Sequence, residues 1–188
     1  CGRGEMLNAF SLRGFEVYGA DLDSDAKELC KPHRIEICDF ENEKIAYEDN
    51  YFDYIFSKSV VEHLNNPLIV SKEIYRMLKP GGKIILMTPS WQHTRWGPFY
   101  LDFTHKTPFT IPSLKDLLKI AGFKEINARF FYQLPLLWRY PFLKFIFAFI
   151  SILPIKYSPM HEKLFISEKL NKVIRFSKEA MIIGVGKK

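Results

Sequence analysis

Two glycines at the start of the chain and a carboxylate after the next apolar run have the types and order of a nucleotide site. The chain opens Cys1-Gly2-Arg3-Gly4, and Asp21 ends the following apolar run. Glycine lets backbone amides approach a ligand closely because it has no Cβ. A carboxylate about 20 residues further on, at the end of the second strand, can accept hydrogen bonds from a ribose. The spacing predicts a bound nucleotide-type cofactor.

Three histidines are candidates for a general base, since imidazole titrates near neutral pH. They are His63, His93 and His105. His105 stands in Leu101-Asp102-Phe103-Thr104-His105, so Asp102 could orient its ring as a carboxylate fixes an imidazole tautomer. Alternatively, Asp102 and Thr104 cap a turn with His105 packed beneath. His63 either takes part in the chemistry or, with Glu62, caps the pocket or starts a helix.

The elements that must position these residues alternate along the chain. Gly14 is a natural helix end, Pro67 a natural helix start, and Lys79-Pro80-Gly81-Gly82 a sharp break. The run KIILMT is typical of a parallel strand covered on both faces. We expect helices over 5–13, 24–29, 67–78 and 113–121, and strands over 15–20, 34–38, 52–56, 83–88, 123–131 and 179–186.

Alternation of helix and strand predicts an α/β fold with a mainly parallel sheet. Ligands of such sheets bind outside the carboxyl ends of the strands. Asp21, Asp39, the stretch 57–63 and the long aromatic loop 89–110 all follow strand ends. We therefore expect these segments to share one edge of the sheet.

Length and charge suit one domain with a basic end. We expect a single domain over 1–188, with a core (1–128), a hydrophobic and basic lid-like insertion (129–178) and a final strand (179–188). Residues 138–188 hold ten Lys and Arg against three Asp and Glu. This excess suits an anionic partner surface, or is a solvated lysine-rich face. The three cysteines form no C-x-x-C pair, so a reducing cytoplasm is the simplest compartment.

The insertion contains an unusual apolar run, FLKFIFAFISIL, between Pro141 and Pro154. As a helix it would be about 18 Å long, against a hydrocarbon core of about 30 Å, so it does not span a membrane. One alternative is a peripheral contact of residues 139–157 with the inner face of a membrane, flanked by Arg139, Lys144 and Lys156. The other is a lid buried on the body or at an oligomer contact.

An ordered set of motifs resembles one family. The chain is similar to class I S-adenosylmethionine-dependent methyltransferases of the UbiE/UbiG-like, type 11 group, over roughly 1–128 and again at the last strand. The motifs are Gly2-Arg3-Gly4, Gly19-Ala20-Asp21, Cys38-Asp39-Phe40, Asn50-Tyr51-Phe52-Asp53-Tyr54-Ile55, Val61-Glu62-His63-Leu64 and Arg76-Met77-Leu78-Lys79-Pro80-Gly81-Gly82-Lys83. The resemblance implies a Rossmann-like sheet with an antiparallel last strand.

The resemblance also implies roles for single residues. Gly2 and Gly4 would lie against the amino-acid part of S-adenosylmethionine. Asp21, rather than Asp23, would hold the ribose hydroxyls. Asp39 would accept from the adenine amino group, unless it only caps a turn, and Phe40 would flank the ring. Ser57, with Lys58 and Ser59, would pass close to the methionine part.

Two departures from the family pattern shape further expectations. The acidic residue and first glycine that the family carries ahead of Cys1 are not in this sequence, so we expect the chain to lack the first strand of the sheet, an N-terminal truncation within the glycine motif. Ubiquinone-forming members carry Glu-x-x-Glu-His, a suspected metal site. Ser59 takes the first of those positions here, and we predict no metal.

The predicted function is methylation of an acceptor oxygen on a glycan, a glycolipid or another small or lipid-linked molecule. A similar Asp-x-Thr-His stretch occurs in methyltransferases of polysaccharide and lipid-linked glycan synthesis. The alternative is a non-catalytic partner or scaffold of this fold at the membrane surface. Leu7 replaces the third small residue of a dinucleotide fingerprint, which argues against a dehydrogenase. Ser57-Lys58-Ser59-Val60 replaces the motif of amino-group methylation in nucleic acids, so no nucleic-acid partner is expected.

Overall fold

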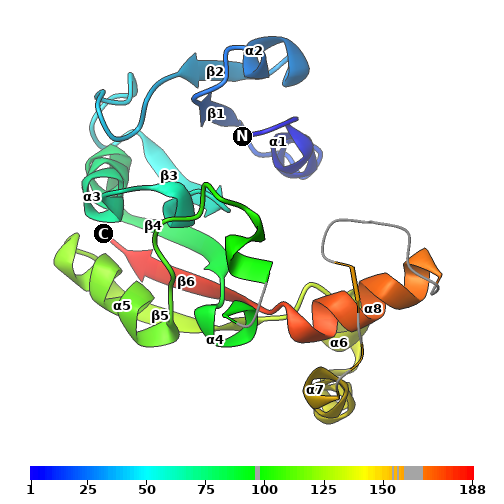
Figure 1. The fold of residues 1–188 in the computed structure, drawn as a ribbon. Helices are drawn as coiled ribbons and strands as arrows, with labels where there is room; N and C mark the ends of the chain where they lie inside the picture. The colour runs from blue at the N-terminus through cyan, green and yellow to red at the C-terminus, as the bar shows by residue number, and fades with distance from the viewer. Residues whose placement is uncertain (96–97, 154, 156, 159–166) are drawn as a thin grey trace.

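A computed structural model of the protein describes residues 1–95, 98–153, 155, 157–158 and 167–188. Helices and strands alternate along the chain (Figure 1). The strands are β1 (Tyr18–Asp21), β2 (Arg34–Ile37), β3 (Phe52–Lys58), β4 (Leu78–Pro89), β5 (Lys124–Phe131) and β6 (Met181–Lys187). The helices are α1 (Glu5–Ser11), α2 (Ala26–Leu29), α3 (Pro67–Met77), α4 (Trp91–Thr94), α5 (Ile111–Ile120), α6 (Pro135–Arg139), α7 (Lys144–Ile152) and α8 (Glu168–Lys178), with 3-10 turns η1 (Val61–His63), η2 (Pro98–Leu101) and η3 (Pro141–Leu143).

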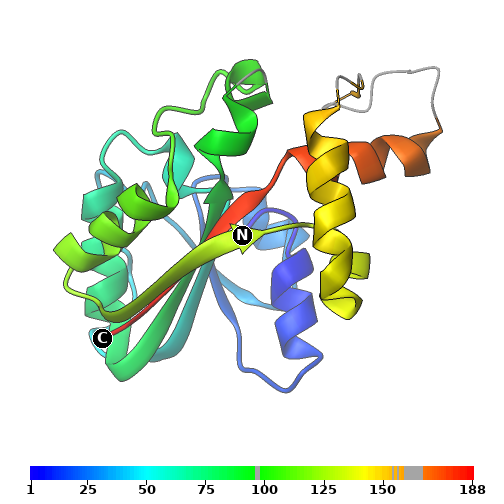
Figure 2. The same ribbon diagram turned by 90° about the horizontal axis from the view of Figure 1, so that it is seen from below.

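The larger sheet has the strand order β3-β4-β6-β5. β3 and β4 are parallel, and β6 runs antiparallel to both β4 and β5. All strands of this sheet except β6 therefore point the same way, which confirms the predicted α/β class and its antiparallel last strand. Figure 2 shows α3 and α5 on one face of the sheet and α1 on the other. The main core, with Ile84, Leu86, Leu114 and Ile182 fully buried, lies between the sheet and α3 and α5.

The smaller sheet is the parallel pair β1-β2. Among the described residues no strand pairs with both β1 and β3, so the two sheets are separate. Aromatic side chains join the two sheets instead. The Tyr18 ring, at the start of β1, contacts the rings of Tyr47, Tyr51 and Phe52 with centroids 5.6 to 5.9 Å apart. The hydroxyl of Tyr47 also donates to the carbonyl of Gly19 at 2.8 Å. We call these four rings the aromatic joint.

Several element boundaries differ from the sequence expectations. β1 begins at Tyr18 rather than residue 15, and β4 begins at Leu78, directly after α3, so that the Lys-Pro-Gly-Gly stretch lies inside the strand. α5 starts at Ile111 because Thr110 and Ser113 form a capping box there. The predicted irregular loop 89–110 contains α4 and η2.

The insertion is more helical than its sequence indicates. It holds α6, η3 and α7, and also α8, which the sequence analysis does not predict. Leu134, Leu137 and Phe147 form its own buried cluster, against which Val173 and Phe176 of α8 pack. Figure 1 shows this part projecting from the end of the sheet. Pro154 and Lys156, which flank the apolar run, lie outside the described residues, as does Trp96 of the aromatic loop.

The contact between α5 and β6 predicts a specific packing response. A Cβ built on Gly184 would lie 2.8 Å from Cδ2 of Leu114. Gly184→Ala should therefore lower the free energy of unfolding by about 1–3 kcal/mol through overpacking. Leu114→Ala alone should cost about 2–5 kcal/mol, since it leaves a cavity. The double variant should cost clearly less than the sum in a urea denaturation cycle, and strict additivity would contradict this contact.

Candidate functional site

The glycine loop is held against Asp21. Gly2 and Gly4 both have positive φ, +58° and +79°, which residues with a Cβ rarely adopt. The amide of Gly2 donates to Oδ2 of Asp21 at 2.8 Å, the amino group of Cys1 lies 2.6 Å from the same oxygen, and the Asp23 amide donates to Oδ1. Burial alone would raise the pKa of Asp21, but these hydrogen bonds outweigh it and the pKa is lowered. Asp21 is therefore an ionised acceptor beside an open glycine turn.

Asp39 lies in a turn after β2. Its Oδ1 accepts from the Glu41 amide at 3.1 Å and its Oδ2 from Nδ2 of Asn42 at 2.8 Å. The Asn42 hydrogen bond, with that of Glu41, lowers the pKa of Asp39. Each oxygen keeps a lone pair, so the turn interpretation and a ligand-binding role are compatible. Phe40 is half-buried and packs against the main core.

A pocket of about 430 Å³ opens where β3 and β4 end. Ser59, just beyond β3, has a φ of +54° and its amide donates to the Met87 carbonyl at 2.9 Å. Ser57 lies two residues earlier in β3 and is half-buried. Ser57, Asp21 and Asp39 are not part of the pocket lining. The pocket is lined by Lys58, Ser59, Pro89, Thr94, Pro98, Phe99, Leu101, Asp102, His105, Gln133, Arg175, Phe176, Glu179, Ala180 and Met181.

Two of the three candidate histidines, His63 and His105, form a cluster in which a neighbouring group contacts Nδ1 of each ring. Nδ1 of His105 lies 2.6 Å from the carbonyl oxygen of Phe99, which can only accept, so Nδ1 carries the proton and Nε2 keeps a lone pair. Thr104 Oγ1 donates to Asp102 Oδ1, and Nδ1 of His63 therefore donates to Thr104 Oγ1 at 2.8 Å. The rings of His63 and His105 are 4.7 Å apart. In both rings Nδ1 is therefore engaged by a neighbour, and Nε2 is the nitrogen left for a ligand.

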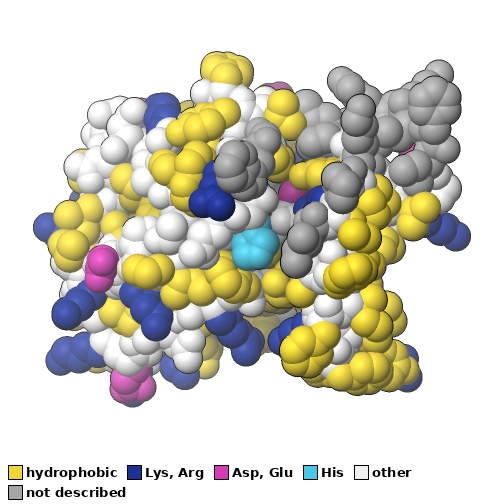
Figure 3. Space-filling model, turned by 60° about the horizontal axis from the view of Figure 1, so that its bottom comes forward, with side chains coloured by type: hydrophobic (Ala, Val, Ile, Leu, Met, Phe, Trp, Pro, Cys, Tyr) yellow, Lys and Arg dark blue, Asp and Glu magenta, His cyan; other side chains and the backbone are white. Residues whose placement is uncertain are grey.

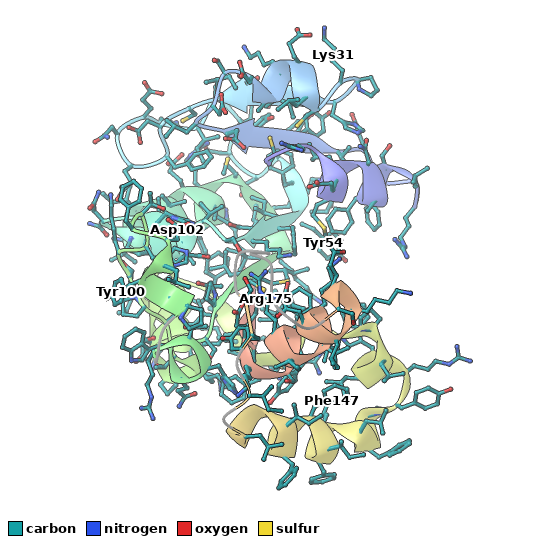
Figure 4. The ribbon with its side chains drawn as sticks, turned by 45° about the vertical axis from the view of Figure 1, so that its right-hand side comes forward. Lys31, Tyr54, Tyr100, Asp102, Phe147 and Arg175 are labelled. Atoms are coloured by element: carbon teal, nitrogen blue, oxygen red, sulfur yellow. The ribbon has the colours of Figure 1, made fainter. Side chains whose placement is uncertain are left out.

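Of the two alternatives for Asp102, the structure shows the turn cap and no hydrogen bond from Asp102 to His105. Asp102 Oδ2 is 3.9 Å from Nε2 of His105, too far for a hydrogen bond, and the Phe99 carbonyl fixes the ring instead. Asp102 caps its own turn through the amide and hydroxyl of Thr104, and acts on His63 through that hydroxyl. Figure 4 shows Asp102 and Tyr100 on the body of the protein, with Arg175 on the helix that faces them.

Glu62 is the buried carboxylate of this cluster. Its Oε2 accepts from Oγ1 of Thr88 at 3.0 Å, whereas its Oε1 is buried without a hydrogen-bond partner among the described residues. Burial raises the pKa of Glu62. A carboxylate oxygen of Glu62 and ring nitrogens of His63 and His105 lie within 4.8 Å of one another, a donor set that an ion could also use. The expectation of no metal site stays a prediction.

Comparison with known proteins identifies the family. A family model described as a methyltransferase domain matches residues 1–127, about two thirds of the chain. The chain belongs to this methyltransferase family.

Individual relatives are more distant. Phosphoethanolamine N-methyltransferase 2 of Caenorhabditis elegans is 25% identical over 116 residues, which cover 58% of this chain and 26% of the relative. A ubiquinone biosynthesis O-methyltransferase of Pseudomonas putida is 32% identical over 95 residues, covering 47% and 41%. The chain spans about a quarter of the length of the first curated relatives that it matches.

Among solved structures, a SAM-dependent methyltransferase from Archaeoglobus fulgidus superposes with a TM-score of 0.67 at 22% identity. The match covers 100% of this chain and 83% of that one. At this identity the likeness shows a common fold, which agrees with the family assignment from the sequence.

Part of the pocket lining was not found from the sequence. Gln133, Arg175 and Phe176 of the insertion line the pocket, as does Glu179 directly after α8, together with the body residues Lys58 and His105. Nε of Arg175 donates to Oε2 of Glu179 at 2.8 Å, an ion pair of i,i+4 spacing. In the sequence, only the i,i+4 spacing of Arg175 and Glu179 could have indicated these pocket residues. Such pairs are common on solvent-exposed helices, so the spacing alone does not indicate a pocket wall.

The buried Glu62 predicts a pH dependence of stability. A folded-state pKa above the unfolded value means that the folded protein binds more protons between the two values, so unfolding becomes easier as pH rises through that interval. Glu62→Gln removes this titration and keeps an acceptor for Thr88. Relative to wild type, the variant should gain stability as pH is raised from 4.5, the ordinary pKa of a glutamic acid, through the raised pKa of the folded protein, by at most about 1.4 kcal/mol per pH unit. A stability difference that stays constant in urea melts over this range would contradict the assignment.

Proposed function

We propose that this chain is part of an S-adenosylmethionine-dependent methyltransferase that methylates an oxygen of a glycan, a glycolipid or another small or lipid-linked acceptor. The observation that carries the proposal is the pocket beyond β3 and β4, which His105 lines while the Phe99 carbonyl holds its Nδ1. Proteins with an open α/β sheet bind their ligands in the crevice beyond the carboxyl ends of the strands.

The residues present fit the cofactor. Gly2 has no atom within 4 Å of a built Cβ, so its turn is open to a ligand. Oδ1 of Asp21 and both oxygens of Asp39 accept one hydrogen bond each, which leaves lone pairs for hydroxyl and amino donors. Gly2, Gly4 and Asp21 would hold the amino-acid and ribose parts, Asp39 and Phe40 the adenine, with Ser57 and Ser59 beside the methionine. S-adenosylmethionine supplies an electrophilic methyl group on a sulfonium.

The chain's own residues supply the proton transfer and the shape of the site. Nε2 of His105 takes the hydroxyl proton of the acceptor, and the Phe99 carbonyl keeps Nδ1 protonated so that Nε2 is the basic atom. The resulting imidazolium is stabilised by the carboxylates of Asp102 and Glu62 nearby. Phe99 and Phe176 offer apolar walls beside the polar Gln133 and Glu179, a mixture that suits a sugar ring with hydroxyl groups.

A lipid-linked acceptor would be met at the inner face of a membrane, and residues 139–157 are the segment that we propose for this contact. Among the described residues, none of the helices has the length and apolar character needed to cross a membrane. The contact would therefore be peripheral.

The cofactor assignment predicts a difference between two neighbouring carboxylates. Asp21→Ala should weaken binding of S-adenosylhomocysteine by about 1–3 kcal/mol, the usual value of hydrogen bonds to a charged group. Asp23→Ala is the matched control, because Asp23 is exposed and its carboxylate accepts only from the Asp25 amide. It should bind with nearly wild-type affinity. Calorimetry that finds Asp21→Ala unchanged would remove Asp21 from the cofactor site.

The base assignment predicts a loss of turnover without a loss of cofactor binding. His105→Ala should lower methyl transfer about 10²–10⁴-fold, because the acceptor hydroxyl then has no positioned base. His93→Gln is a control from the same stretch, since His93 packs against Phe130 and lies outside the pocket wall. The turnover of both variants is measured as the transfer of labelled methyl groups to glycolipid and free glycan acceptors. Full turnover in His105→Ala would return His105 to a structural role.

A further inference from the structure

The insertion ends in a projecting apolar face that the rest of the described chain does not cover. Figure 3 shows hydrophobic side chains gathered along this part of the molecule, with Lys and Arg at its edges. Phe142, Phe145 and Phe149 are 67%, 83% and 64% exposed, and Trp138 and Ile146 are more than half exposed. We call these five residues the aromatic face. Exposed apolar groups scattered singly are ordinary, but a contiguous group with a polar rim marks an interaction surface.

The aromatic face is the outer side of a helix whose inner side is already packed. Phe147 of α7 is buried at 7% exposure against α6 and α8, while Phe145 and Phe149, two positions away on either side, point outward. The insertion therefore has its own core, and the outward residues are not needed to complete it. A helix that is apolar on both sides normally has both sides covered.

The charges around the aromatic face identify the kind of surface that covers it. The sequence has no Asp or Glu between Glu125 and Glu162, and it carries Arg129, Arg139, Lys144 and Lys156 in that stretch. Arg139 and Lys144 are exposed and border the aromatic face. Each such cation contributes about 1 kcal/mol near an anionic lipid surface. α7 has nine residues, far short of the about 20 needed to span a bilayer, so it would lie in the interface.

We infer that the aromatic face docks on an anionic lipid membrane, with Phe142, Phe145 and Phe149 inserted among the acyl chains and Arg139 and Lys144 at the headgroups. The binding itself does not depend on methyl transfer, whereas its role in bringing a lipid-linked acceptor to the pocket rests on the proposed function. α8 connects the two sites. Its Phe176 both packs on the insertion core and lines the pocket, next to Arg175 and Glu179.

Vesicle binding of the whole chain tests the inference. Wild-type protein should sediment with vesicles of phosphatidylcholine and phosphatidylglycerol, and less with phosphatidylcholine alone. Phe145→Ser with Phe149→Ser should weaken binding about 100-fold or more, because two inserted aromatic side chains are lost. Phe103→Ser is the matched control, since Phe103 is 92% exposed on the body, and it should bind like wild type.

A second pair of variants tests the electrostatic part. Arg139→Gln with Lys144→Gln should weaken binding to the anionic vesicles about 30-fold at low salt. Removing two exposed lysines of α5, Lys115→Gln with Lys119→Gln, should have little effect. Wild-type binding should also weaken as salt rises, since screening shortens from about 30 Å at 0.01 M to about 8 Å at 0.15 M.

Three outcomes would overturn the inference. Wild-type protein that stays in solution with anionic vesicles excludes a lipid partner. A Phe145/Phe149 double variant that unfolds, judged by circular dichroism, would show that these side chains are buried in solution. Light scattering that finds a wild-type dimer and a monomeric double variant, without vesicle binding, would assign the aromatic face to a second copy of the chain. Calorimetry of S-adenosylhomocysteine binding to the same proteins separates these outcomes from a failure of the proposed cofactor site.

Discussion

The aromatic joint between the two sheets is the contact on which the geometry of the site depends. Asp21 and Asp39 follow strands of the smaller sheet, whereas the pocket and its histidines follow strands of the larger one. Side-chain packing, rather than a ladder of backbone hydrogen bonds, sets the distance between them. Tyr47 is central, because it touches Tyr18 and Phe52 and donates to the Gly19 carbonyl. Its burial raises the pKa of Tyr47 to about 12, so the phenol stays a donor throughout the physiological range.

A second constraint operates within the larger sheet. The backbone carbonyl of Glu62 accepts from the amides of Lys106 and Thr107 at 2.8 and 3.0 Å, which ties the loop after β4 to the turn after β3. His63 and His105 are brought together by this tie, although 41 residues separate His63 from the Thr104 that it contacts. The buried carboxylate of Glu62 is costly on its own, because burial disfavours its charge. Adjacent imidazoles that can carry positive charge offset part of that cost, so the fold and the proposed chemistry use the same group.

The sequence predicted what depends on local pattern and missed what depends on tertiary contact. Apolar runs such as 83–88 and carboxylates at strand ends are local signals, and the α/β fold and the family followed from them. The orientation of His105 depends on a carbonyl six residues away, which composition does not reveal, so the sequence left two alternatives open for Asp102. The apolar run of α7 is uniform, and a uniform run does not indicate which side is buried. Only the structure distinguishes Phe147 from Phe145.

The insertion changes how specificity can arise in this domain. The body supplies Lys58 and His105 to the pocket, and α8 with the residue that follows it supplies Arg175 and Glu179. Glu179 is mostly buried, and its carboxylate pairs with Arg175 and is hydrogen-bonded to Tyr157. Because α8 carries this part of the pocket lining and also packs on α7, a displacement of the projecting helices would alter the pocket directly. Under the proposed function, acceptor selection would then depend on where the insertion is held, as well as on the histidines proposed for proton transfer.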